Sequence, residues 1–378
     1  MKKLTIFFLV LLLFFFMPRQ THASEVENEI LGSLSQEIND FKNTLPNDIK
    51  SYLENSLLDT DASSLLSNGL NVGKLTDYII EYLFLGINKT LKSFTAILIL
   101  LLISSIFNML SSTIKNSSVS YAFNLCSSLT VALTAFKVCF SITENVTSYT
   151  KTLLNAMCSF APIMAGVQIM AGKLTTATIT NASMILFISI VDCLLVALMI
   201  PVIKICMMLS CVKSLGGIDF GGISKTLKTS FSSITVFIMS LFMFVFSMKN
   251  TLSQSADSLS LKTARFAISS FVPLVGASIN EALRTVSASL NLIKNSCGIT
   301  AILAILLIML PIIIYVFLNK ISFGILSCIA KIISCEKEST VLEEAGSICT
   351  YLLTIITCTC VFFIFSITIF IKTSLEVR

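Results

Sequence analysis

Charged residues inside or beside apolar segments are the first candidates for chemistry in this sequence. Asp192 and Lys137 lie within such segments, and Glu281 and Arg284 follow another. A charge at membrane depth is costly, and it usually faces a bundle interior or a water-filled path. Asp192 could therefore couple transport to an ion, or it could pair with Lys137 between two spans, which is the preferred interpretation. Glu281 and Arg284 are three residues apart and could pair on one helical face.

Enzymatic chemistry has few candidate residues in this chain. The single histidine is His22, which lies in a predicted signal peptide, so Ser-His-Asp triads, Cys-His pairs and histidine zinc sites are not expected. All twelve cysteines lie at or beyond Cys126, in or near apolar segments, where cysteine packs as a small apolar residue. The glycine-rich residues 216–225 lack the Gly-Lys-Ser/Thr sequence of a phosphate-binding loop. We therefore expect no enzyme and no catalytic, cofactor or metal site.

Two similar segments, 111 positions apart, indicate an internal duplication. Residues 159–166 read SFAPIMAG and residues 270–277 read SFVPLVGA, and a Ser/Thr-rich stretch and a long apolar segment follow each. Duplicated, broken apolar segments are typical of membrane transport folds. Proline makes an unbroken helix unfavourable, so we expect both segments to break and re-enter the membrane. The positions proposed for the breaks and a conduit are Pro162, Gly166, Pro273 and Gly276.

The composition indicates that the segments carrying these residues are membrane-spanning helices. The chain is 55% hydrophobic and only 12% charged, far outside the range of soluble domains. Six stretches are apolar and long enough to span a bilayer: residues 94–111, 121–142, 178–200, 231–248, 298–318 and 347–371. The predicted fold is all-α, a polytopic helical membrane protein with repeat copies at about 121–230 and 231–346 and a final span at 347–371.

The N-terminal part has a different character. Residues 1–23 have two lysines, an apolar run and a small-x-small pattern ending at Ala23, and they predict a signal peptide. Residues 24–93 contain eleven acidic residues and five lysines, and they predict a small acidic helical region exported across the membrane. The membrane domain would then cover residues 94–378. Lysine-rich loops near residues 204–228 and 320–337 would face the cytoplasm, which favours re-entrant segments.

With this layout, the sequence resembles the stage III sporulation protein AE family of endospore-forming bacteria. The resemblance is clearest in residues 269–276 (SSFVPLVG), 280–286 (NEALRTV) and 292–298 (LIKNSCG). It implies a non-enzymatic membrane subunit of a trans-envelope channel or export complex between mother cell and forespore. The implied location is the mother-cell membrane facing the forespore, with the N-terminal region in the intermembrane space. The implied partners are other stage III sporulation A proteins and stage II sporulation protein Q, and the family supplies no catalytic residues.

Two alternatives remain open from the sequence. A stand-alone secondary transporter would use Asp192 as its coupling carboxylate and would move a solute when reconstituted alone. A purely structural anchor would tolerate replacement of its spans by unrelated ones. Contacts with membrane lipid are expected in each case and a homo-oligomer is possible, while no nucleic-acid motif is visible.

Overall fold

The computed structural model describes residues 36, 38–46, 49–50, 72–113, 117–194, 199–214, 221–271 and 276–372. The predicted signal peptide, most of the predicted exported region and Pro273 lie outside the described residues. All regular structure in the described part is helical. Its long helices are α5 (Val72–Thr113), α6 (Ser117–Met170), α7 (Leu174–Leu194), α8 (Ile200–Ser214), α9 (Gly221–Phe271), α10 (Gly276–Ile332) and α11 (Glu336–Lys372).

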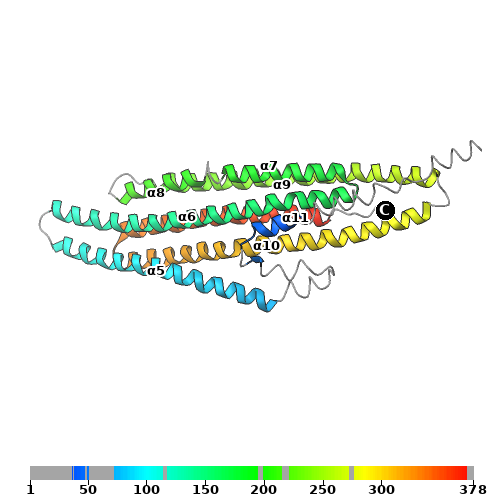
Figure 1. Cartoon of the computed structure of the whole chain (residues 1–378). Helices are drawn as coiled ribbons and strands as arrows, with labels where there is room; N and C mark the ends of the chain where they lie inside the picture. Colours follow the sequence, from blue (N-terminus) through cyan, green and yellow to red (C-terminus); the bar gives the residue numbers. More distant parts are fainter. Residues whose placement is uncertain are drawn as a thin grey trace, which may run out of the picture.

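The helices lie side by side in one elongated bundle (Figure 1). α10 and α11 lie at its centre, and buried apolar side chains follow α10 from Ala301 to Ala330 and α11 from Val341 to Phe370. Six helices in the described ranges are long and apolar enough to cross a membrane, and the share of each window buried within the bundle is highest for α10 and α11. The prediction of a polytopic all-α membrane protein is therefore confirmed. Helices that are apolar around much of their circumference are stable only against other helices or lipid.

Two tight turns lie toward opposite ends of the bundle. At the α6–α7 end, Gly172 has a φ of 76°, and the Lys173 amide donates to the Gln168 carbonyl at 2.9 Å. At the α10–α11 end, Ser334 has a φ of 60°, and the Cys335 amide donates to the Ala330 carbonyl at 2.8 Å. Both are Schellman motifs, which end a helix through one residue in the left-handed region.

The expected break at Pro162 is wrong, because α6 runs through this residue as one 54-residue helix. A helical proline removes one backbone hydrogen bond and costs ~3 kcal/mol. Here the neighbouring side chains of Phe160, Ile163 and Met164 are buried, so packing holds the helix together on both sides of the proline. Pro311 lies inside α10 in the same way. The chain reverses instead after Met170, where Gly172 supplies the left-handed residue. The duplication and the re-entrant segments remain predictions.

The apolar segments do not all lie at one level of the bundle. Tyr78 Oη donates to the Leu307 carbonyl at 3.1 Å, and Ser104 Oγ donates to Glu338 Oε1 at 2.7 Å. α5 therefore runs parallel to α10, and by Ser104 it has already reached the α10–α11 end. The rest of α5 and the start of α6 project beyond that end as a hairpin (Figure 1). Leu102, in the middle of the apolar stretch of α5, is ~36 Å along the helix from Tyr78, which contacts the middle of the apolar stretch of α10. The two apolar stretches are therefore displaced from each other by about a membrane thickness.

Candidate functional site

A buried ion pair joins α9 to α11 near the α10–α11 end. Lys228 Nζ lies 2.5 Å from Glu344 Oε1, and the two side chains are 8% and 16% exposed. Ser224 also donates to the Glu344 carboxylate, and Lys228 donates to Ser347. Each charged group therefore has several hydrogen-bonding partners, which offset the cost of removing it from bulk water.

The ion pair lies at the wall of a polar cavity between α9 and α11. The cavity has a volume of about 540 Å³. Hydroxyl and charged side chains dominate its lining, which comprises Lys225, Lys228, Thr229, Ser232, Ser233, Thr340, Glu343, Glu344, Ser347, Thr350, Tyr351 and Thr354. Such a surface can bind water, an ion or the polar part of a solute, because hydroxyls both donate and accept hydrogen bonds. A cavity of this kind between apolar helices is our candidate functional site.

The polar contacts continue around the α10–α11 turn. Lys331 pairs with Glu343 at the surface, and Ser327 contacts Ser339 at 3.0 Å. Cys335 is buried in this region, and burial raises the pKa of its thiol. These contacts connect α10 to α11 beside the cavity.

A second polar cluster lies at the α6–α7 end. The Asp257 carboxylate on α9 accepts hydrogen bonds from the Thr176 amide and Thr176 Oγ1, both at 2.7 Å, and from the Thr175 amide at 3.2 Å. It thereby caps the first turn of α7 from another helix, where free amides and the helix dipole favour a negative charge. One turn deeper, Thr180 Oγ1 donates to Asn250 Oδ1 at 2.9 Å. Burial lowers the pKa of Lys173 in the adjacent turn, and the nearby Asp257 opposes that shift.

Sequence analysis singled out Lys137 and Asp192, and the structure places both on the outer surface. No ion pair joins them, although both are described. Lys137 is 33 residues before the end of α6 and Asp192 is 18 residues after the start of α7, so they differ by ~22 Å in depth along the hairpin. The preferred interpretation of Asp192 as a partner of Lys137 is therefore not supported by the geometry.

The remaining predicted positions lie far from the cavity along the chain. Gly166 is half-buried in α6, and Gly276 is the first residue of α10. Glu281 and Arg284 lie in the first part of α10, and their side chains are outside the described residues, as is Pro273. The structure does not test the proposed pairing of Glu281 with Arg284.

The residues of the cavity were missed as a site by sequence analysis. Lys228 was assigned to a lysine-rich cytoplasmic loop, but Lys228 and Glu344 both lie within helices. A helical signal was available, since Ser224 and Lys228 are four apart, as are Ser347 and Tyr351, and each pair shares a face. What the sequence lacked was the partnership between the two faces. Among the side chains that the structure describes, no three potential ligands are grouped to hold a metal ion.

The chain was compared with known proteins. No curated protein and no solved structure matches it. Residues 60–374 match the family described as Stage III sporulation protein AE. This match spans all the long helices and confirms the resemblance drawn from the sequence motifs. The chain therefore belongs to the stage III sporulation protein AE family and has a role related to sporulation.

Proposed function

We propose that the chain is a non-enzymatic membrane subunit of a trans-envelope channel or export complex between mother cell and forespore, required for forespore development. The observation that carries this proposal is the polar cavity between α9 and α11, with its buried pair Lys228–Glu344. Placing a largely buried ion pair between membrane helices costs free energy that an apolar interface would not. That cost is understandable if the cavity forms part of a hydrated path.

The charges near the α10–α11 end support an orientation of the bundle in the membrane. Lys225, Lys228 and Lys331 lie toward the α10–α11 end, and basic residues favour the cytoplasmic side. The N-terminal residues Phe41 and Leu45 are buried in the same core, and the Phe41 ring lies 5.4 Å from the Phe160 ring. Phe160 is near the α6–α7 end, so the N-terminal region would lie on the opposite side, in the intermembrane space.

Partners are proposed from the family. Other stage III sporulation A proteins and stage II sporulation protein Q would assemble with the N-terminal region and the membrane bundle. The alternative of a transporter coupled through Asp192 has no specific observation in its favour, because that carboxylate lies on the outer surface of α7. Purification of the tagged protein from sporulating cells in mild detergent distinguishes the two, since a complex subunit retains partners and a transporter does not need them.

The cavity itself can be tested by filling it. Thr354 lines the cavity, and Thr354→Phe would narrow it, while Thr226→Phe places the same bulk on an exposed α9 residue outside the lining. We expect Thr354→Phe to abolish forespore-specific reporter expression while the protein stays in the membrane with its partners. Thr226→Phe should leave the reporter unchanged. Full reporter activity in stable Thr354→Phe would contradict a role for this cavity.

A further inference from the structure

One face of α6 is polar along its middle third. Its residues are exposed and recur at intervals of four and three, which is the spacing of a single helical face: Lys137, Ser141, Glu144, Ser148, Lys151 and Asn155. We call this set the α6 polar stripe. From Lys137 to Asn155 it runs for ~27 Å, close to the ~30 Å thickness of a hydrocarbon core.

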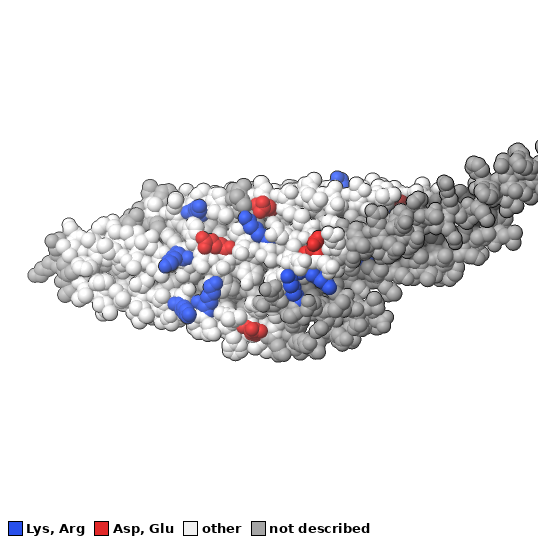
Figure 2. All heavy atoms as spheres, in the orientation of Figure 1, with Lys and Arg blue, Asp and Glu red and all other residues white. Residues whose placement is uncertain are grey.

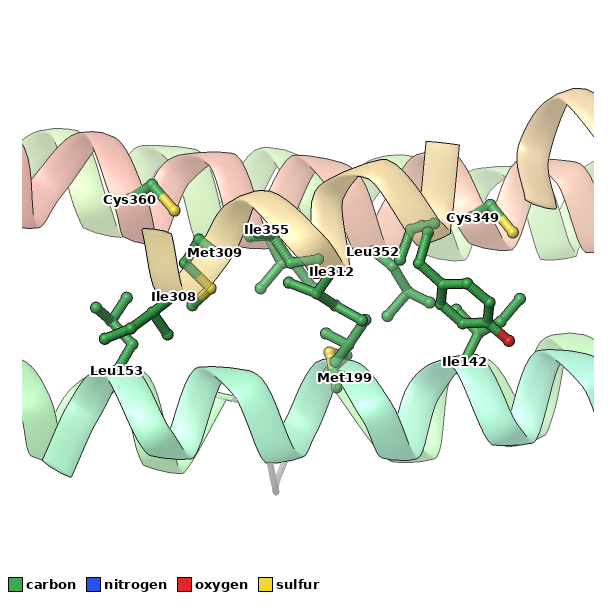
Figure 3. Close-up of a cluster of buried hydrophobic side chains, with 14 of the residues drawn as sticks. Ile142, Leu153, Met199, Ile308, Met309, Ile312, Cys349, Leu352, Ile355 and Cys360 are labelled. Carbon is green, nitrogen blue, oxygen red and sulfur yellow. The ribbon is translucent and has the colours of Figure 1, made fainter. Parts of the chain in front are cut away.

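The stripe lies at the most apolar level of the bundle. On the opposite face of α6, Ile142 and Leu153 are buried among side chains of α10 and α11 (Figure 3). Leu153 lies beside Ile308 and Met309 in this view. α10 has no charged residue between Lys294 and Lys320, and this uncharged stretch measures ~38 Å. Glu144 and Lys151 therefore lie on the outside of the bundle at the depth where charges in contact with lipid are costly.

The lipid-facing surface of the bundle has a different composition. On α9 most of the residues exposed at the same level are apolar, and the large ones are Ile234, Phe237, Leu241, Phe244 and Met248. That face is suited to acyl chains, because lipid cannot satisfy polar groups. The α6 polar stripe is not, so another protein surface must cover it.

The neighbouring helix α7 contributes an acidic residue at a matching depth. Lys151 is 19 residues before Met170, the end of α6, and Asp192 is 18 residues after Leu174, the start of α7. Both are therefore ~27–28 Å from the turn that joins the two helices. The same alignment of the two segments continues further from the turn. Phe140 is 30 residues before Met170 and Lys204 is 30 residues after Leu174, and Lys204 Nζ lies 5.9 Å from the centroid of the Phe140 ring.

Lys151 and Asp192 are both exposed, and no ion pair joins them within the chain. Acidic and basic side chains alternate over α6 and α7 in the middle of the bundle (Figure 2). A surface with both signs of charge is poorly matched by a partner of one sign. It can match a copy of itself, provided that symmetry brings opposite charges together.

We propose that this face binds a second copy of the same chain, with Lys151 of each copy paired to Asp192 of the other. Two copies in one membrane share an orientation, so their two-fold axis runs along the membrane normal and preserves depth. That rotation places α6 of one copy against α7 of its partner. Two equivalent pairs form, because the interface is isologous. Glu144 then lies ~6 Å in depth from the partner's Lys204, near enough for the flexible lysine to reach it.

Charge reversal tests this arrangement in the full-length protein. Two differently tagged copies would be co-expressed and co-purified in mild detergent. Lys151→Glu in both copies, or Asp192→Lys in both, places like charges together, and we expect recovery of the second tag to fall about tenfold. When one copy carries Lys151→Glu and the other carries Asp192→Lys, opposite charges meet again at both sites. Recovery should then return to the wild-type value.

The mixed pair separates contacts between copies from contacts within one copy. If Lys151 and Asp192 paired only within one chain, each mutant chain would keep its own defect and the mixture would not recover. Lys249→Glu on the exposed face of α9 is the matched control and should leave recovery unchanged. Wild-type copies that fail to co-purify, or reversals without effect, would overturn the proposal. So would loss of a different protein from Lys151→Glu preparations while the two tags stay together. None of these outcomes depends on channel activity.

Discussion

Lys228 of α9 and Glu344 of α11 form a buried ion pair, with 2.5 Å between Nζ and Oε1, although 116 positions separate them in the sequence. The pair fixes the two helices at one level of the bundle, since Ser224 and Ser347 hold the same charged groups from the next turns. A second pair, Lys331 with Glu343, lies close by but at the surface. The two pairs form a natural comparison.

Breaking the buried pair should destabilise the bundle strongly. Lys228→Met leaves Glu344 charged and without its main partner, and we expect a loss of ~3–5 kcal/mol in the free energy of unfolding. Adding Glu344→Gln should recover part of this loss, because no lone charge then remains. Thermal unfolding followed by size-exclusion chromatography in detergent measures both. Lys331→Met is the control and should have no measurable effect, because solvent screens that pair. Equal losses of unfolding free energy in Lys228→Met and Lys331→Met would contradict the burial of the Lys228–Glu344 pair.

Gly298 marks a close approach of α10 to the end of α11. A Cβ at this position would lie 2.6 Å from Ile371 Cδ1 and closer still to Ile371 Cγ1. We expect Gly298→Ala to cost ~1–3 kcal/mol, since the Ile371 side chain must leave its present rotamer to make room. At Gly324 of the same helix nothing lies within 4 Å of the added Cβ, and Gly324→Ala should stabilise by about 1 kcal/mol. If both substitutions shifted the unfolding midpoint in the same direction, that result would argue against this packing.

Ser334 holds the left-handed position in the α10–α11 turn, with a φ of 60°. A residue with a Cβ pays about 1 kcal/mol or more in this region, whereas glycine does not. We therefore expect Ser334→Gly to raise the unfolding midpoint. The converse change, Gly172→Ala at the α6–α7 turn, with a φ of 76°, should lower it. Midpoints that move in the opposite directions would mean that these turns adopt other conformations in solution.

The depth of the α5–α6 hairpin can be measured directly. Cys126 and Cys193 are both exposed, but Cys126 is ~39 Å along α6 from Thr152, which lies level with Cys193. In single-cysteine variants carrying a fluorophore, mid-bilayer spin-labelled lipid should quench the Cys193 probe much more than the Cys126 probe. Equal quenching would show that the hairpin lies within the bilayer. The α6 polar stripe would then lie outside the bilayer.

Sequence alone determined the class of the protein. The apolar content and the six long apolar stretches require a membrane-spanning helical bundle, because only helices satisfy their own backbone within one apolar segment. The motifs near residues 269–298 determined the family. These properties are local, so no knowledge of the neighbouring helices was needed. The expected break at Pro162 was wrong because the helix there also depends on packing, which is not a local property. Burial of the surrounding α6 residues offsets the unfavourable effect of proline on the helix.

Only the tertiary structure decided which polar residues act together. Lys228 and Glu344 were visible as charges beside apolar stretches, but their pairing depends on how α9 and α11 are rotated and aligned. The capping of α7 by Asp257 likewise joins residues about 80 positions apart. Hydropathy gives the depth of each helix by itself, and it carries no information on which helix faces which. Packing of side chains along α10 and α11 fixes that alignment, and with it the cavity, the displaced hairpin and the polar stripe on α6.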